Sequence, residues 1–323
     1  MVGVQFQGTW STYTDAQRAA LLDKLVAMGV KSVRIGISWA MIQPRRPTPT
    51  DPGWNWSWGI PRVDSVVAMA RERGLVVHAT FGRTPPWANG DAGEPTAPTS
   101  LDDWRTAVRF VARRYAGKVS SWEIWNEPNL PKFFTGASPV AYTRLLCAAY
   151  PVVHAEAADT PVVFGGVSGN DWPFISEAYA AGAKGCFDVL AVHPYQRYGY
   201  PPAAPAPTPE PWYFANVRLV RGIEQHYHDL KPIWFTELGW STHANTPALP
   251  EYEKGVSRQT QAAYLVQTLR LTKRRYPYVA RVYLYQARDE TGFSVENNNF
   301  GLFTTTLQPK PAVAALTHYL HGG

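Results

Sequence analysis

Two glutamates stand at the ends of strand-like runs and have the chemistry of an acid/base pair. Glu127 follows a strand predicted over residues 119–125, and Glu237 ends a strand predicted over residues 232–237. Hydrolysis of a glycosidic bond needs one protonated carboxyl to donate to the leaving oxygen. It also needs one ionised carboxylate to attack the sugar or to activate water. Two glutamates brought to one cleft from different strands would meet both needs.

The elements that would position these glutamates form a repeating pattern along the chain. Short apolar runs alternate with helical patterns, and strands are predicted at residues 2–7, 31–37, 75–81, 119–125, 161–166, 187–192, 232–237 and 279–285. This alternation indicates a parallel sheet with crossover helices, and eight such units close into a barrel that typically needs about 250 residues. The 323 residues therefore predict class α/β, with a single (β/α)8 TIM barrel domain over residues 1–323.

The segments after the predicted strands are long, whereas the segments before them are short. The long ones cover residues 38–59, 82–99, 126–137, 194–210, 238–255 and 286–308. Barrel enzymes carry their reactive groups on the loops at the carboxyl ends of the strands, so the site is expected at that end. Residues 201–211 are rich in proline and are predicted to form a stiff surface loop.

Several stretches of the chain resemble known families. Asn126-Glu127-Pro128, together with the glutamate that ends the seventh strand, resembles the clan A glycoside hydrolases. Within that clan the sequence is most similar to family 39, through Thr84-Pro85-Pro86-Trp87-Ala88, residues 187–195 and Pro309-Lys310-Pro311-Ala312. The resemblance covers essentially the whole chain. It implies a barrel that hydrolyses glycosides with retention, with Glu127 as acid/base, Glu237 as nucleophile, and neither a cofactor nor a metal.

The resemblance also implies which residues bind the substrate. Asn126 matches the residue that holds the sugar 2-hydroxyl, and Arg34 matches an arginine that pairs with the nucleophile and keeps it ionised. The other residues expected to contact the sugar or to orient the carboxylates are His78, Trp87, His193, Tyr195, Trp240 and Tyr285. Many clan members place a tryptophan at the end of the eighth strand. Here Tyr285-Gln286 stands there instead, and either residue could take that role.

Some candidate residues also have a structural interpretation. Glu123 lies inside the fourth predicted strand and is expected to be a buried structural partner rather than a reactant. Trp54, Trp56 and Trp58 alternate along the loop after the second strand, and they form either a stacking platform for sugar or packing beneath that loop. The 13 tryptophans and 17 tyrosines of the chain fit a carbohydrate site.

Composition and charge exclude several other classes of protein. The net charge is +6, but the arginines are scattered through predicted helices, so no nucleic-acid partner is expected and only a weak preference for anionic glycans stays open. No apolar run reaches the roughly 20 residues of a membrane span. Cys147 and Cys186 are either bridged or free thiols. We expect a monomer outside the cell or at its surface, with the cytoplasm as the alternative.

Three functions remain open at this point. The family 39 β-xylosidases usually carry an added β-domain that walls off the pocket, and this chain ends after its eighth helix, which favours endo-cleavage of a polysaccharide. The alternative is exo-cleavage of an oligosaccharide, in a pocket closed by loops 194–210 and 238–255. The third hypothesis is a non-catalytic carbohydrate-binding barrel. It is disfavoured because both glutamates and Arg34 are present together.

Overall fold

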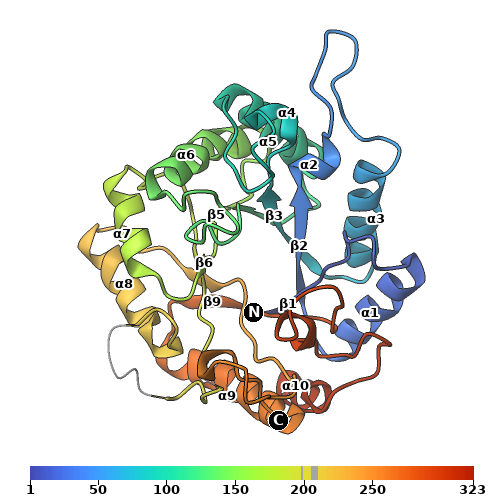
Figure 1. The fold of residues 1–323 in the computed structure, drawn as a ribbon, viewed down its shortest axis with the longest axis vertical. Helices are drawn as coiled ribbons and strands as arrows, with labels where there is room; N and C mark the ends of the chain where they lie inside the picture. The colour runs from blue at the N-terminus through green and yellow to red at the C-terminus, as the bar shows by residue number, and fades with distance from the viewer. Residues whose placement is uncertain (198, 205–209) are drawn as a thin grey trace.

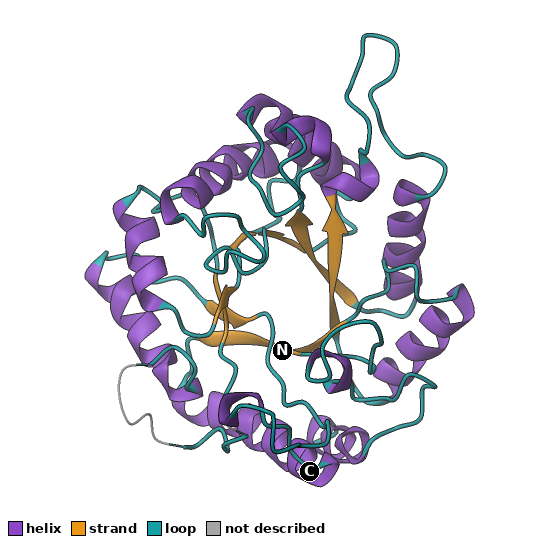
Figure 2. Ribbon diagram, in the orientation of Figure 1, coloured by secondary structure: helices purple, strands orange, loops and turns teal. Residues whose placement is uncertain are grey.

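The computed structural model shows a closed barrel of parallel strands inside a ring of helices (Figure 1, Figure 2). It describes residues 1–197, 199–204 and 210–323, apart from the side chain of Tyr252. The strands pair in the order β5-β4-β3-β2-β1-β9-β8-β7-β6. A parallel bridge from Val163 on β5 to Val189, just before β7, closes the sheet into a barrel. The predicted fold, an α/β TIM barrel, is confirmed.

The strands fall where apolar and β-branched residues were found in the sequence. They are β1 (Val2–Gln5), β2 (Ser32–Ser38), β3 (Val76–Gly82), β4 (Ser121–Ile124), β5 (Val162–Phe164), β6 (Val167–Ser168), β7 (Leu190–His193), β8 (Ile233–Phe235) and β9 (Val279–Leu284). β5 lies within the fifth predicted strand, residues 161–166, and β6 follows just beyond it. The break falls at Gly166, whose N–H donates to the Glu123 side chain at 2.9 Å. A Cβ there would lie 2.2 Å from His193 Nε2, so a side chain has no room.

The helices follow the strands in sequence and surround them in space (Figure 2). They are α1 (Asp15–Ala27), α2 (Trp39–Ile42), α3 (Gly59–Glu72), α4 (Pro86–Asn89), α5 (Leu101–Arg114), α6 (Pro139–Glu156), α7 (Trp172–Ala180), α8 (Val217–His226), α9 (Arg258–Arg275) and α10 (Pro311–Leu320). Short 3-10 turns occur at η1 (Phe214–Asn216), η2 (Glu251–Glu253) and η3 (Asn297–Asn299). Ser100, Ser138 and Ser257 begin helices by accepting a backbone N–H from the first turn. None of the described helices combines the length and the apolar character needed to cross a bilayer.

The interior of the barrel is polar at mid-height, although the layer between strands and helices is apolar. Val33, Ile35 and Trp104 belong to that apolar layer and are fully buried. Gln5 and Arg34 are buried too, and they are direct partners in the register of β1 and β2. Buried polar groups are costly unless they are paired, so the interior depends on a complete hydrogen-bond network.

A disulfide joins Cys147 on α6 to Cys186 before β7 across a sequence separation of 39 residues. This settles the question that the sequence left open. Closing a loop of this length in the unfolded chain corresponds to about 4 kcal/mol of stability. The Cys147→Ala/Cys186→Ala variant is therefore expected to lose about 2–4 kcal/mol of unfolding free energy, measured by equilibrium urea denaturation. An unchanged denaturation midpoint would contradict this expectation.

Candidate active site

A cleft of about 1000 Å³ opens at the carboxyl ends of the strands. It is formed by the long loops that the sequence placed there, although the proline-rich stretch 201–211 lies partly outside the described residues. The predicted site residues that line the cleft are Arg34, Asn126, Glu127, Tyr195, Glu237, Trp240 and Tyr285. The structure therefore brings most of the predicted residues into one concave surface.

The two glutamates face each other in this cleft. One carboxylate oxygen of Glu127 and one of Glu237 lie within 4.8 Å of each other, and both residues are less than one-tenth exposed. Glu127 adopts a left-handed backbone conformation with φ 46°, which costs of order 1 kcal/mol in a residue other than glycine. The Glu127 N–H donates to Gly166 O at 2.9 Å, and its carbonyl accepts from Leu130 at 3.0 Å. The backbone around Glu127 is thus held in place from both sides.

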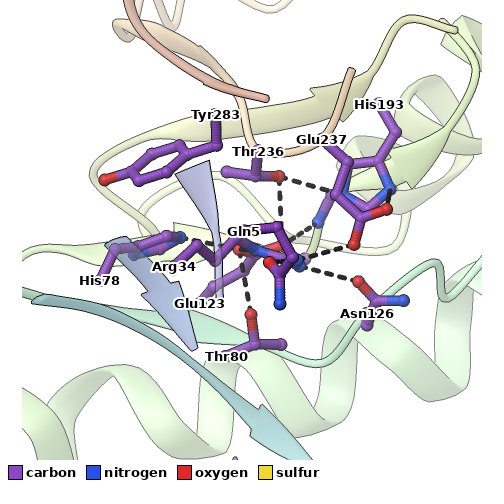
Figure 3. A network of polar contacts seen from close by, with 12 residues as sticks. Gln5, Arg34, His78, Thr80, Glu123, Asn126, His193, Thr236, Glu237 and Tyr283 are labelled. Atoms are coloured by element: carbon purple, nitrogen blue, oxygen red, sulfur yellow. Dashed lines mark hydrogen bonds and ion pairs between the residues drawn. The ribbon is translucent and has the colours of Figure 1, made fainter. Parts of the chain in front are cut away.

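Arg34 connects the glutamate at the cleft surface with the network beneath it (Figure 3). Its Nη1 donates to Glu237 Oε1 at 2.7 Å and to Gln5 Oε1 at 2.7 Å. Its Nε and Nη2 donate to the two oxygens of Glu123 at 2.8 and 3.0 Å. Nη2 also donates to Asn126 Oδ1 at 2.7 Å. One guanidinium therefore orients two carboxylates and two amides.

Glu123 is the buried structural carboxylate that the sequence indicated. It is fully buried, and besides Arg34 it contacts His78 Nε2 at 2.8 Å and the Gly166 N–H at 2.9 Å. Burial by itself raises the pKa of Glu123, but the nearby positive charge of Arg34 and the hydrogen bond from His78 hold it well below its usual range. Glu123 is therefore a permanent negative charge under the cleft.

His78, expected to contact the sugar or to orient the carboxylates, lies beneath the cleft and is not among the residues that line it. His78 is fully buried on β3, with Nδ1 2.8 Å from Ser121 Oγ and Nε2 on Glu123. Burial lowers the pKa of His78, so the imidazole is neutral at pH 7. It lies inside the barrel below the cleft and supports Glu123 there. The alternation of side chains along a barrel strand indicates which of them point inward, but not how deep each one lies.

Removal of the Glu123 charge is expected to destabilise the protein. The Glu123→Gln variant leaves Arg34 buried with one carboxylate fewer, and breaking a buried pair in this way costs about 3–5 kcal/mol. Glu156 is a matched control, since its contacts with Arg109 and Arg113 are longer, at 3.6 and 3.9 Å, and lie at the surface. Glu156→Gln should cost less than about 1 kcal/mol. Urea denaturation of both variants measures the difference, and equal effects would contradict the assignment.

His193 lies beneath both glutamates rather than in the cleft wall. Its Nδ1 is 3.0 Å from Glu127 Oε1 and 3.7 Å from Glu237 Oε2, and Nε2 contacts Thr236 Oγ1 at 3.1 Å. Burial alone would lower the pKa of His193, but the charges of Glu237 and Glu127 raise it above its ordinary value. His193 therefore orients the carboxylates, one of the two roles expected for it.

Tyr195 fixes the second oxygen of Glu237. Its hydroxyl donates to Glu237 Oε2 at 2.9 Å, while Arg34 holds Oε1. Burial, followed by the charge of Glu237, raises the pKa of Tyr195 well above its ordinary value, so the phenol stays protonated. Both oxygens of Glu237 thus accept a hydrogen bond, which restricts the rotation of its carboxylate.

The aromatic candidates separate into cleft residues and supporting residues. Trp240 and Tyr285 line the cleft, whereas Gln286 is 1% exposed and does not. Trp87 donates its indole N–H to Gln43 O at 2.8 Å, packs on Trp39 and is not among the residues that line the cleft. A single tryptophan in a loop gives no sign of which face it covers.

Trp54, Trp56 and Trp58 were expected either to pack beneath their loop or to form a platform for sugar, and the structure gives them different environments. Trp54 is 8% exposed and stacks on Phe110 at 3.8 Å, so it packs beneath the loop. Trp56 is exposed beside the same ring. Trp58 is 41% exposed and lines the cleft, so it can serve as a platform.

Sequence reasoning missed other residues of this site. Trp10 and Phe293 line the cleft with their rings 5.3 Å apart, although they lie at opposite ends of the chain. Gln5 and Thr236 belong to the network under the cleft. Thr236 could have been found, because it directly precedes Glu237. Trp10 and Phe293 could not, since only barrel closure brings their loops together.

Among the described residues, Glu127, His193 and Glu237 form the group with the spacing of metal ligands. Arg34 Nη1 already lies 2.7 Å from Glu237, and this positive charge disfavours a divalent cation next to the same carboxylate. The arrangement is better suited to acid/base and nucleophilic chemistry.

Fold and site together define a class of protein, the clan A glycoside hydrolases. The family model described as cellulase (glycosyl hydrolase family 5) matches residues 2–200. The chain belongs to this family. The sequence had instead placed it nearest family 39 within the clan, and enzymes of that family are among its structural neighbours. No curated protein matched the chain.

Solved structures show the same barrel. A family 39 glycoside hydrolase from Bacteroides cellulosilyticus has a TM-score of 0.76 at 22% identity, covering 98% of this chain and 62% of that one. A monomeric β-xylosidase from Caulobacter crescentus has a TM-score of 0.73 at 20% identity, covering 99% and 67%. A GH5_18 variant from Bifidobacterium longum in complex with Manb1-4GlcNAc has a TM-score of 0.73 at 16% identity, covering 99% and 77%. The chain spans less than two thirds of the first of these proteins.

Proposed function

We propose that this protein is a retaining glycoside hydrolase with Glu237 as nucleophile and Glu127 as general acid/base. The observation that carries the proposal is the placement of the two carboxylates, with their nearest oxygens within 4.8 Å across one cleft. Retaining enzymes hold the pair about 5–5.5 Å apart, whereas inverting enzymes need about 6.5–9.5 Å to admit a water between them. The observed spacing supports direct attack by Glu237.

In the first step, a carboxylate oxygen of Glu237 bonds to the anomeric carbon as the bond to the leaving oxygen breaks. Glu127 gives its proton to that oxygen, so the departing sugar leaves as an alcohol. Arg34 and Tyr195 each donate a hydrogen bond to one oxygen of Glu237 and so aim its carboxylate before the attack. The product of this step is a glycosyl ester on Glu237.

In the second step, Glu127 acts as a base. It takes a proton from water, whose oxygen attacks the anomeric carbon and displaces Glu237 as a carboxylate. Esterified Glu237 carries no charge, so Glu127 has lost its nearest negative neighbour in the cleft. Two displacements on one carbon restore the original anomeric configuration.

Asn126 is placed to bind the sugar during both steps. Arg34 holds its Oδ1, so the planar amide directs Nδ2 away from the guanidinium (Figure 3). A hydrogen bond from Nδ2 to the 2-hydroxyl would strengthen as the ring flattens toward an oxocarbenium ion. Asn126 would then contribute more to the transition state than to substrate binding.

We propose endo-action on a polysaccharide, and the aromatic lining of the cleft supports it. Trp58 and Phe293 are 41% and 54% exposed and line the cleft, with Trp10 packed on Phe293. Phe133 and Trp212, from loops elsewhere around the barrel, line it too. Aromatic faces distributed around an open cleft suit several consecutive sugar units. Exo-action remains the second candidate, because a β-xylosidase is among the similar structures.

The test is a polysaccharide panel with analysis of the products over time. An endo-enzyme should give a ladder of oligosaccharides and a rapid fall in polymer length. Release of monosaccharide alone would favour exo-action. Proton NMR of the first product reports the anomer, and inversion would rule out the mechanism. Glu237→Gln protein, treated identically, controls for contaminating hydrolases.

We also propose that the protein works in an oxidising compartment, outside the cell or at its surface. The Cys147–Cys186 disulfide supports this, because such bonds persist mainly in secreted proteins. Fractionation of the native host, probed with an antibody, tests it. Detection in the cytoplasmic fraction alone would contradict it.

A further inference from the structure

Two basic side chains share one aromatic ring in the cleft. Arg83, in the loop after β3, lies with its guanidinium carbon 5.6 Å from the centre of the Phe133 ring. Lys132, in the loop after β4, lies with Nζ 5.2 Å from the same centre. All three residues line the cleft that holds Glu127 and Glu237. Two positive charges therefore lie next to the Phe133 ring, in the cleft that holds the two glutamates. The uncharged ring does not cancel them.

Among the residues that the structure describes, no carboxylate forms an ion pair with Arg83 or Lys132, although Lys132 is near enough to Glu296 to lower its pKa. Arg34 is the opposite case, since two carboxylates contact it. Beyond the site already assigned, the basic residues lining the cleft are Arg83, Lys132, Arg197 and Lys254, and the acidic ones are Glu253 and Glu296. Burial, followed by the charge of Glu253, raises the pKa of Glu296, while the charges of Arg197 and Lys132 lower it. Lys254 is paired with Glu251, so the remaining lining outside the site already assigned has a small positive excess, with Arg83, Lys132 and Arg197 against Glu253 and Glu296.

Backbone hydrogen bonds hold the chain in place at Arg83 and at Phe133. Arg83 has a left-handed conformation with φ 69°, costly for a residue other than glycine, and its carbonyl accepts from the Ala40 N–H at 2.9 Å. The Phe133 N–H donates to Leu130 O at 2.9 Å, and the Leu130 N–H donates to Glu127 O at 3.0 Å. Two consecutive turns thus connect the ring to the proposed acid/base, so the backbone that carries Lys132 and Phe133 has a set position relative to Glu127.

We propose that the substrate is an acidic polysaccharide, and that Arg83 and Lys132 bind the carboxylate of a uronic acid unit next to the bond that is cut. Guanidinium and ammonium groups form charge-assisted hydrogen bonds with carboxylates, and the planar fork of arginine matches carboxylate geometry. A cleft with low-dielectric walls and positive excess also raises the local concentration of a polyanion. This inference rests on the proposed function, since it names the substrate class of the same site.

The test is a binding measurement that uses matched probes. In the Glu237→Gln background, which should bind without turnover, isothermal titration compares acidic hexasaccharides with neutral ones of the same backbone. The pairs are a β-1,4-glucuronic acid hexamer against cellohexaose, a hexamannuronate against mannohexaose, and a hexagalacturonate against its carboxyl-reduced form. A sulfated cellohexaose distinguishes carboxylate recognition from general attraction to anions.

At least one acidic probe should bind about tenfold or more tightly than its neutral partner, as one or two charged hydrogen bonds would provide. Adding Arg83→Gln and Lys132→Gln should abolish that preference. Arg45→Gln is the matched control, because Arg45 is an exposed arginine paired with Asp51 outside the cleft, and it should change nothing.

Three results would overturn the inference. They are equal or tighter binding of every neutral probe, a preference that survives the double substitution, and tight binding of the sulfated probe alone. The proposed function is judged separately. Hydrolysis of neutral polymers that needs Glu127 and Glu237 but not Arg83 would refute only the inference. A preference for acidic probes without turnover of any polymer by the unsubstituted protein would refute only the function.

Discussion

The Glu237→Gln variant should lose at least about 10⁴-fold in kcat, because removal of a nucleophile blocks the first displacement altogether. An amide has the shape of the carboxylate and can still contact Arg34 and Tyr195, but it cannot form the glycosyl ester. Initial rates on the polymer found in the panel, followed by reducing-end release, measure the loss. Substrate affinity should change much less than kcat.

Two controls make this result specific. Glu177→Gln replaces an exposed glutamate on α7, on the outside of the barrel, and should keep full activity. Thermal melting should show that the Glu237→Gln protein is folded. A folded variant that retains more than about one-tenth of the original rate would exclude Glu237 as the nucleophile.

The Glu127→Gln variant has the second large expected effect, and its signature differs. Loss of general acid/base catalysis should lower kcat on the polymer by about 10²- to 10⁴-fold. An aryl glycoside with a good leaving group needs little protonation, so the first step should survive and the glycosyl ester on Glu237 should accumulate. Added azide, which needs no base, should then restore turnover and give a glycosyl azide of retained configuration.

Azide thus separates the roles of the two glutamates. It should rescue Glu127→Gln on the activated substrate, and it should yield no product of retained configuration with Glu237→Gln. The opposite pattern would exchange the roles of the two residues. No rescue of either variant would exclude a double displacement at this pair.

The barrel and both glutamates could be predicted from the sequence because each has a local signal. Strand and helix patterns alternate along the chain, and Glu127 and Glu237 come shortly after the ends of β4 (Ile124) and β8 (Phe235). The chain order of the elements then places their carboxyl ends at one rim. The break between β5 and β6 was missed, since it depends on the bond from Gly166 to the distant Glu123.

The sequence could not predict the depth of a side chain or its neighbours across the barrel. His78 was expected to contact the sugar or to orient the carboxylates, but it lies below the cleft on Glu123. Trp87 lies on the short helix α4 after β3, where it packs on Trp39. Arg83 and Lys132 come from different loops and meet only at Phe133. These features depend on tertiary packing, which a residue pattern along the chain does not record.

One positive charge, on Arg34, positions the carboxylates of the site. Arg34 sits between the buried Glu123 and the cleft residue Glu237, and it compensates both. Without Glu123, the guanidinium would be a buried charge with a single carboxylate partner, Glu237. With Glu123 present, four side chains hold Arg34 in place, and Arg34 can orient Glu237 before the substrate binds. Such preorganisation lowers the reorganisation needed during reaction.

The most direct test of the account is to trap the glycosyl ester. A 2-fluoro glycoside with a good leaving group, made for the sugar that the panel identifies, slows the second step more than the first. Mass spectrometry of the intact protein should show one added sugar, and peptide mapping should place it on Glu237. A label on another residue, or none alongside an inverted hydrolysis product, would contradict the central claim.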